Sequence, residues 1–344
     1  MKQGLIIAGI VLIIFTSCHN QPWDFPDSDY TTVYFPYQYP IRTLVLGDDI
    51  VDNTLDNAHK FKVMATLGGV YENKENVTID LVVDYSLCDQ LIYGAEDSTA
   101  VLALPANYYV LPDNKQIVIP AGEFTGGIEV QLTDAFFNDP LAIERTYVLP
   151  LRLTSVSNAD SILQGKSELE NPDRRVTGDW ATVPKDYTLY AVKYINQWHG
   201  NYLRRGVTEV KGTDGNTSLD TTIVYHAKYV EWDQVVSLKT KSLNEVALNL
   251  NSRVRGAGQD LPFELKISFN SDGKCTLTQP ADVAYTVSGN GEFVKDGDAW
   301  GNEAQDVLRL KYNVTFDNSV HTFTDTIVMR DRGIKLETFV PVVL

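Results

Sequence analysis

Short hydrophobic runs with partial two-residue alternation recur along the first half of the chain after residue 30. Gly, Pro, Asn and Asp separate these runs, as expected for strands joined by turns. The runs are TTVYFPY, KFKVMATL, VTIDLVVDY, NYYVL, QIVIP, GIEVQL and TYVLPLRL. Seven short strands at this spacing are typical of an immunoglobulin-like β-sandwich. Pro150 lies inside the last run and predicts an edge strand or a bulge, because proline cannot donate to a sheet ladder.

The second half carries the same pattern at a higher density. Its runs are YTLYAVKY, GNYLRRG, TTIVYHAKYVEW, QVVSLKT, EVALNLN, FELKISFN, KCTLTQ, VAYTVSG, GEFVKD, DVLRLKYNVTF, HTFTDTIVMR and GIKLETFVPV. Tight turns such as Ser271-Asp272-Gly273 join them, and no sustained helical stripe occurs. Closing such a meander into a barrel removes exposed sheet edges. We therefore predict an all-β protein, in which an antiparallel, lipocalin- or calycin-like β-barrel follows the sandwich.

The length of the chain predicts two hydrophobic cores, because a single core stops growing at about 250 to 300 residues. The stretch GKSELENPDRRVTGDW is polar and aperiodic, as expected of a linker. We therefore predict these segments: 1–17 signal peptide, 18–29 lipidated tether, 30–165 sandwich, 166–180 linker and 181–344 barrel.

The first 18 residues, MKQGLIIAGIVLIIFTSC, are typical of a secretory signal. The apolar run from Leu5 to Phe15 is too short to cross a bilayer, which takes about 20 residues. Cys18 follows the small pair Thr16-Ser17 and resembles the lipobox of bacterial lipoproteins, whose cysteine becomes acylated and holds the protein at a membrane. The alternative is an ordinary secreted protein with a free cysteine near its cleavage site.

The charge of the chain excludes some partners. Its formal net charge is −16, and removal of residues 1–17 takes away Lys2 and no acid, which leaves −17. A surface of this sign repels nucleic acid and anionic lipid, so we expect neither as a partner. Residues 18–175 hold 24 acidic and 10 basic residues against 21 and 18 in residues 176–344, which again indicates two domains.

Two pairs of segments also resemble a known family. IVIPAGEFTGGIEVQLTD with TYVLPLRLTS resembles the N-terminal immunoglobulin-like domain of uncharacterised surface lipoproteins from gut-type Gram-negative bacteria. GEFVKDGDAWGNEAQDVLRLKYNVTF with HTFTDTIVMRDR is similar to the β-barrel domain that accompanies it, and QWHGNYLRRG matches the opening strand of that barrel. These proteins are akin to accessory glycan-binding lipoproteins of starch-utilisation-like systems. The resemblance implies an outer-membrane protein that faces the exterior and helps to capture carbohydrate.

The search for catalytic motifs gives no enzyme class. The five histidines form no HExxH or other close ligand pair, and neither a GxSxG elbow nor a phosphate-binding glycine loop occurs. Turns such as Gly47-Asp48-Asp49 lack the spacing of an EF-hand, so solvated turns are favoured over a calcium site. Glycoside hydrolysis stays open in principle, because it needs only two suitably spaced carboxylates. We predict a protein that is not an enzyme and has neither cofactor nor metal.

Aromatic residues carry the positive functional signal. Sugars dock their C–H faces on Trp and Tyr rings, while neighbouring polar groups bind the hydroxyls. Trp300, in a glycine- and acid-rich stretch that reads as a loop, and Trp232 are the predicted glycan contacts, with Asn302 and Arg309 as polar helpers. The alternative for Trp300 is a plug over the mouth of the barrel. Trp198 is assigned to structure.

Two function classes follow from these observations. The first is a non-catalytic outer-membrane lipoprotein that binds poly- or oligosaccharide as an accessory to capture and import. The second is a structural or assembly partner of an outer-membrane glycan transporter, which predicts a broad contact patch and no sugar-sized groove. An apolar ligand inside the barrel is a third alternative.

Overall fold

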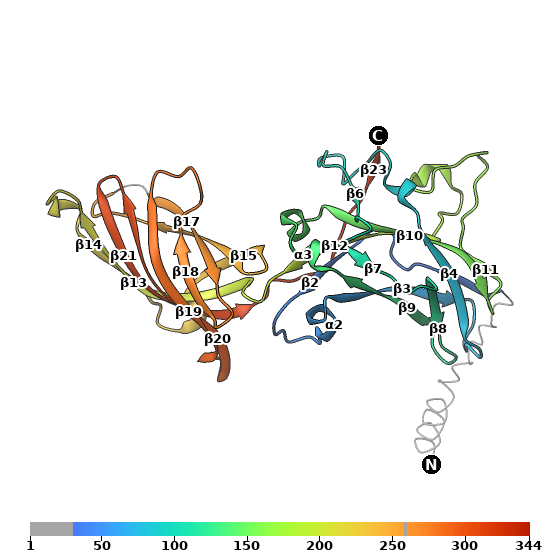
Figure 1. The fold of residues 1–344 in the computed structure, drawn as a ribbon, viewed down its shortest axis with the longest axis horizontal. Coiled ribbons are helices and arrows are strands. Elements are labelled where there is room, and N and C mark those ends of the chain that lie inside the picture. The colour runs from blue at the N-terminus through green and yellow to red at the C-terminus, as the bar shows by residue number, and fades with distance from the viewer. Residues whose placement is uncertain (1–29, 258–259) are drawn as a thin grey trace, which may run out of the picture.

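The computed structural model describes residues 30–257 and 260–344. The predicted signal peptide, the lipidation site Cys18 and the tether lie outside these residues. The prediction of an all-β protein is confirmed, because two packed sheets form one body and a closed antiparallel barrel forms a second body beside it (Figure 1). No helix in the described part of the chain is long and apolar enough to cross a bilayer.

The first body, called the sandwich below, consists of a five-stranded and a seven-stranded sheet. The strands of the first sheet, in spatial order, are β11 (Ser161–Ile162), β1 (Thr32–Tyr34), β3 (Lys60–Gly68), β9 (Thr125–Leu132) and β7 (Tyr109–Val110). Those of the second are β22 (Glu337–Thr338), β2 (Pro40–Val45), β12 (Tyr187–Ile195), β10 (Tyr147–Ser157), β4 (Val77–Val83) and β8 (Gln116–Ile119), with β6 (Leu102–Ala103) beside β10. One core cluster draws buried residues from both sheets, which is the defining feature of a sandwich.

Short elements complete the sandwich. A separate two-stranded sheet pairs β23 (Val342–Val343) with β5 (Leu91–Ile92). The helices are α2 (Thr54–Asn57), α3 (Asp134–Phe137) and the 3₁₀ turns η1 (Tyr85–Cys88), η2 (Pro140–Ile143) and η3 (Thr177–Asp179).

The barrel closes because its first strand pairs with its last over twelve residue pairs. Its strands are β13 (Gly200–Gly212), β15 (Gln234–Ser242), β16 (Glu245–Ser252), β17 (Leu261–Phe269), β18 (Lys274–Thr278), β19 (Thr286–Trp300), β20 (Glu303–Phe316) and β21 (Ser319–Asp331). A ninth strand, β14 (Thr221–Tyr225), pairs with residues 206–210 of β13, whereas β15 pairs with residues 200–204 of that strand. The 3₁₀ turns η4 (Thr217–Leu219) and η5 (Val230–Trp232) lie before and after β14. Apolar side chains from each of the eight strands of the closed barrel point inward and fill its interior.

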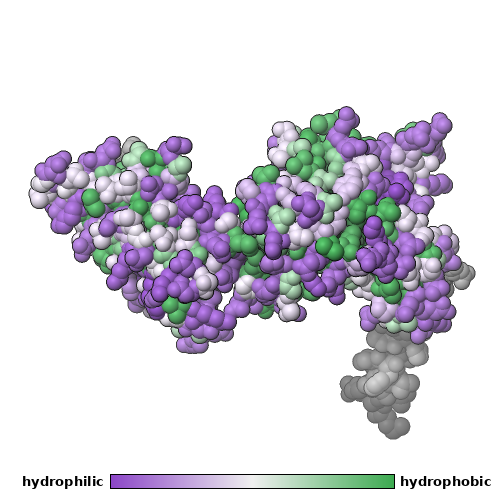
Figure 2. Space-filling model, in the orientation of Figure 1, coloured by the Kyte–Doolittle hydropathy of each residue, from purple (hydrophilic) through white to green (hydrophobic). Residues whose placement is uncertain are grey.

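The structure corrects the predicted domain boundaries. Residues 187–195, expected to belong to the barrel segment 181–344, form β12, a central strand of the sandwich between β2 and β10. Residues 166–180, expected to be a linker, fold against the sandwich, where Arg175 donates to the Leu87 and Asp89 carbonyls. The connection to the barrel is the short stretch 196–199, and after β21 the chain returns to the sandwich. Figure 2 shows the narrow waist that these crossings make between the two bodies.

Candidate functional site

Trp300 does not lie in a loop, and that prediction is wrong. It ends β19, where it pairs with Glu303 across a tight hairpin to β20. Its indole Nε1 donates to the Met329 carbonyl at 3.1 Å, and the side chain is half-buried. The ring therefore folds back against β21 of the barrel wall.

The two predicted polar helpers lie along the same hairpin. Asn302 occupies the turn with a φ of +65°, a left-handed conformation that asparagine tolerates. Arg309 lies further along β20, donates to the Gly297 carbonyl at 2.9 Å and has Glu292 Oε1 3.9 Å from its guanidinium. The hydrogen bond of Arg309 thus braces the hairpin itself.

Trp232 is exposed and lies elsewhere. Its side chain is 66% exposed and meets the ring of Tyr229 edge to face at 4.8 Å. Asp233 closes this loop, since it accepts from the Ala227 amide and pairs with Arg205. Strands β13 and β21 separate this loop from the Trp300 hairpin in the order of the barrel sheet, so the structure does not bring the two tryptophans together. Trp198, assigned to structure, is buried and stacks on Phe269 at 3.9 Å.

A groove at the waist is the candidate site. Its volume is about 800 Å³, within the range of small-molecule sites. Residues from β2, β3 and β12 form its floor, while residues 49–53 and 331–336 form its walls. None of Trp300, Trp232, Asn302 and Arg309 lines it. We call it the junction groove.

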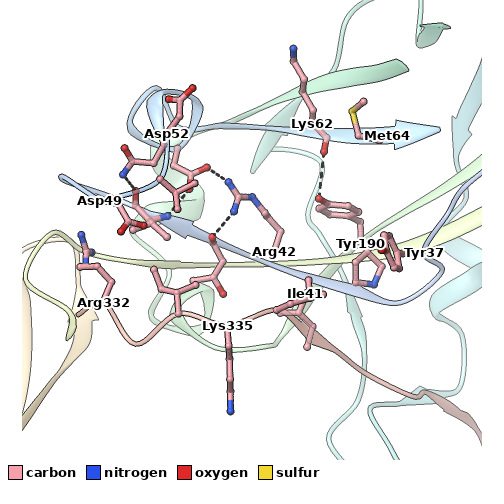
Figure 3. Close-up of a pocket in the computed structure, with 18 of the residues that line it drawn as sticks. Tyr37, Ile41, Arg42, Asp49, Asp52, Lys62, Met64, Tyr190, Arg332 and Lys335 are labelled. Atoms are coloured by element: carbon pink, nitrogen blue, oxygen red, sulfur yellow. Dashed lines mark hydrogen bonds and ion pairs between the residues drawn. The ribbon is translucent and has the colours of Figure 1, made fainter. Parts of the chain in front are cut away.

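Aromatic rings lie at one end of the junction groove. Tyr190 stacks on the buried Phe61 with ring centroids 5.3 Å apart and planes 10° apart, which fixes the orientation of its ring. Tyr37 stands beside it with 61% of its side chain exposed (Figure 3). Met64 adds a half-exposed thioether on β3. This end therefore offers a flat, preformed apolar shelf to a ligand.

Charged groups lie at the centre and at the opposite end. Figure 3 places Arg42 between the tyrosines and the carboxylates Asp49 and Asp52. Arg42 pairs with Asp56, which also accepts from the Val45 amide at 2.8 Å. Burial raises the pKa of Asp56 above its usual value, although the Val45 amide and the Arg42 guanidinium oppose this shift. The Arg42 side chain keeps 37% exposure and is available to a ligand.

Hydrogen bonds to backbone carbonyls hold the walls in place. Asn53 donates to the Val45 and Gly47 carbonyls at 2.9 and 2.6 Å, which shapes the wall that carries Asp49 and Asp52. The guanidinium of Arg332 donates to four carbonyls, those of Leu46 and Asp48 just before one wall and those of Asn196 and His199 in the connection between the two bodies. The groove is thus built where the two bodies meet.

The ionic side chains of the junction groove balance. Its lining contains four acidic residues, Asp49, Asp52, Asp56 and Asp331, and four basic ones, Arg42, Lys62, Arg332 and Lys335. A lining with both donors and acceptors and no excess of either sign suits a neutral, hydroxyl-rich ligand. Exposed apolar side chains stand between them, with Ile50 fully exposed and Leu336 84% exposed.

The sequence analysis missed this site. It singles out neither Tyr37 nor Tyr190, and it favours solvated turns near Asp48. One usable signal was the apolar pair Ile50-Val51 inside the acidic stretch GDDIVDN, because such a pair is costly in a solvated turn. The wall formed by residues 331–336 carries no comparable signal, because its position depends on the return of the chain to the sandwich.

Comparison with known proteins places the chain beside bacterial proteins of unknown function. A domain of unknown function (DUF5627) matches residues 197–333, close to the observed bounds of the barrel. A family described as an N-terminal domain matches residues 27–160. No curated protein matches.

A crystal structure of a protein of unknown function from Bacteroides ovatus is 40% identical, with a TM-score of 0.86, over 92% of this chain and 100% of that one. A second Bacteroides ovatus protein of unknown function is 12% identical, with a TM-score of 0.42, over 90% and 100% of the two chains. An auxiliary nutrient binding protein from Bacteroides thetaiotaomicron is 12% identical, with a TM-score of 0.39, over 84% and 90%. The last two likenesses are too distant to carry a conclusion.

Proposed function

This chain belongs to the family of the 40% identical Bacteroides ovatus protein of unknown function, and we propose that it is a non-catalytic surface lipoprotein that captures carbohydrate in the junction groove. The observation that carries the proposal is the composition of the groove. Tyrosine rings, one of them fixed by stacking, lie at one end, and acidic and basic side chains that can form hydrogen bonds line the remainder. A sugar ring needs both features, one for its C–H face and one for its hydroxyls.

The balance of charge in the groove supports a neutral oligosaccharide as the ligand. A uronic acid or a sulfated sugar would find one carboxylate for every cation, with Arg42 already paired to Asp56. A volume of about 800 Å³ has room for more than one sugar ring, so we propose a short stretch of a neutral chain as the bound unit.

The location is part of the same proposal and rests on the first 18 residues. The short apolar run and Cys18 support export and acylation, and an acyl anchor would hold the sandwich near the outer membrane with the groove open to the exterior. The alternative is an assembly partner of a transporter, which the exposed Ile50 and Leu336 would favour as protein contacts.

The test is a glycan array with residues 19–344 as the parent protein. We expect one class of neutral glycan to bind and Tyr190→Ala to bind it at least about fivefold more weakly, since a ring contact of this kind contributes about 1 kcal/mol beyond area burial. Trp232→Ala is the matched control, because Trp232 is an exposed aromatic residue outside the groove.

Two results would contradict the proposal. Binding that Trp232→Ala abolishes and Tyr190→Ala leaves intact would move the site to the barrel loop. Silence across a broad panel would favour the assembly partner instead.

A further inference from the structure

A second cleft lies on the sandwich and shares no lining residue with the junction groove. Its volume is about 400 Å³. The turn after β4 supplies Asp84 and Ser86, β10 supplies Arg152, and the segment 172–175 covers it. We call it the arginine cleft.

The composition of this cleft departs from that of the chain. Three arginines, Arg152, Arg174 and Arg175, line it beside two aspartates, Asp84 and Asp173. Residues 18–175 contain only 10 basic residues against 24 acidic ones, so three of the ten lie here. This concentration of guanidinium groups, each beside one aspartate, is a feature that an anion could recognise through the N–H groups left over.

Arg175 is fully used by the protein. Its Nε and Nη2 donate to Asp173, and its Nη1 donates to the Asp89 carbonyl at 2.6 Å and the Leu87 carbonyl at 3.3 Å. Arg175 therefore fixes the segment 172–175 against the sandwich and uses four of its five N–H groups to do so.

Arg152 and Arg174 are only partly used. Arg152 donates from Nε to Asp84 at 2.7 Å, and its two terminal nitrogens bond to no other group in the described part of the chain. Arg174 directs Nε and Nη2 to a single oxygen of Asp186, at 3.2 and 3.1 Å, and its Nη1 has no acceptor among the described residues. Both side chains are about a third exposed, at 33% and 30%, so a ligand can reach them.

The existing ion pairs orient these free donors. Asp186 holds the Nε–Nη2 edge of Arg174 and Asp84 holds the Nε of Arg152, while the other terminal nitrogens of both side chains have no partner among residues 30–257 and 260–344. Guanidinium forks bind the paired oxygens of carboxylate, sulfate and phosphate groups with matched geometry. A small oxyanion in the cleft would complete both forks.

We propose that the arginine cleft binds the oxyanion group of a small ligand through Arg152 and Arg174. The arginine cleft is a different site from the junction groove, so this proposal does not depend on carbohydrate binding in the groove. The shared chemistry is a planar or tetrahedral oxyanion, which either a free inorganic ion or an acidic sugar could supply.

The test is calorimetric titration of residues 19–344 with sodium sulfate, sodium glucuronate and glucose at constant ionic strength set with chloride. We expect sulfate or glucuronate to bind and glucose to give no heat. Tighter binding of glucuronate identifies an acidic sugar as the ligand, and tighter binding of sulfate identifies the inorganic ion.

The variant Arg152→Gln removes one fork and should weaken binding at least about tenfold, as expected for the loss of charge-assisted hydrogen bonds. Arg145→Gln is the matched control, because Arg145 is also 33% exposed and paired to one aspartate, Asp97, but lies outside the cleft. Equal binding by Arg152→Gln and the parent, or no heat from either anion, would overturn the proposal. Thermal unfolding of each variant confirms that it is folded, so loss of structure is distinguished from loss of binding.

Discussion

His321 shows how a single buried residue links the stability of the barrel to pH. Its side chain is fully buried, with Nδ1 2.6 Å from the Ser252 hydroxyl and Nε2 3.0 Å from the Ser319 hydroxyl. Burial lowers the pKa of His321 to about 4, because the charged form loses its hydration. His321 therefore binds a proton near pH 6.5 in the unfolded state but only near pH 4 in the folded state.

The free energy of unfolding should fall as pH decreases from about 6.5 towards 4, since the unfolded state binds more protons there. The contribution of His321 is about 3 kcal/mol at the lower end, by the conversion of roughly 1.4 kcal/mol per pKa unit. Urea denaturation across this pH range measures it. His321→Asn should reduce the change in the free energy of unfolding over this pH range by that amount. Some pH dependence should remain, because burial also lowers the pKa of His199 to about 4. An equal pH dependence in the variant would contradict this account.

The ion pair Arg204–Asp325 is a second residue-scale feature of the barrel interior. Both side chains are buried, with Arg204 Nη2 2.9 Å from Asp325 Oδ2, and Tyr312 donates to the same oxygen at 2.8 Å. Arg204 also lies 3.9 Å from the ring centre of Tyr225. The cation is thus shielded by an aromatic ring and neutralised by one carboxylate.

Removal of one partner should be far more costly than removal of both. Asp325→Asn leaves a buried guanidinium without its counter-ion and should lower the free energy of unfolding by about 3 to 5 kcal/mol. The double variant Arg204→Met, Asp325→Leu should lose less than Asp325→Asn alone, because two apolar groups need no counter-charge. Urea titration of the three proteins measures the difference. A double variant less stable than Asp325→Asn would show that the pair itself stabilises the barrel.

At the scale of elements, β10 and β12 show what hydrophobic patterns predict and where they fail. Strand positions follow well from alternation, because each barrel strand has one face in solvent. YTLYAVKY lacks that alternation, since β12 is buried on both sides of the sheet, and this difference could have assigned it to the sandwich. The pairing of β12 with β2, from the start of the chain, could not be deduced locally.

Pro150 was expected at an edge or a bulge, and that expectation is wrong. It lies in β10, between β12 and β4, opposite Leu189. The ladder with β4 begins only at Leu151, and the Asp84 amide donates to the Pro150 carbonyl at 2.9 Å. Pro150 therefore sits where the neighbouring strand ends, so its missing amide hydrogen breaks no ladder bond on that side.

Gly126 on β9 lies directly against the backbone of β8, a strand of the other sheet of the sandwich. A Cβ at this position would lie 2.1 Å from the Val118 carbonyl oxygen, a backbone atom that cannot rotate away. Gly126→Ala should therefore lower the free energy of unfolding by about 1 to 3 kcal/mol through overpacking. Gly178→Ala, with no atom within 4 Å of the added carbon, is the control and should be close to neutral. Equal effects in urea denaturation would refute the close approach.

At the scale of the whole molecule, the C-terminal segment joins the two bodies. After β21 the chain follows the wall of the junction groove, adds β22 to β2, and buries Phe339 against Tyr39 and Tyr93 at ring distances of 5.6 and 5.0 Å. The sandwich is thus completed by residues almost 300 positions apart. The sequence predicts two bodies from length and charge, but no local pattern shows that the last strands belong to the first body.

Phe339→Ala should release this segment from the sandwich. The loss of a buried phenylalanine costs about 3 to 5 kcal/mol, which exceeds what two-residue strands such as β22 and β23 could offset. We expect calorimetry to show the sandwich melting earlier and separately from the barrel. Phe124→Ala, at a 38% exposed phenylalanine, is the control. A single unshifted transition would mean that the segment is not needed to hold the bodies together.

The candidate site emerges only at this largest scale. Tyr190 comes from β12, Arg42 from β2 and Leu336 from the returning segment, so no stretch of sequence contains the groove. Residue types alone favoured tryptophans, whereas the structure assembles tyrosines with charged side chains. The prediction of sugar-binding chemistry from aromatic content thus stays a prediction, with its proposed location moved to the junction.

The most direct test of the central claim is hydrogen–deuterium exchange of residues 19–344 with and without pools of neutral oligosaccharides. The account predicts slower exchange in 49–53 and 331–336, the two walls of the junction groove, and unchanged exchange in the Trp232 loop at 226–233. Protection confined to 226–233 or to the 296–302 hairpin, or no protection with any pool, would contradict carbohydrate capture in the groove.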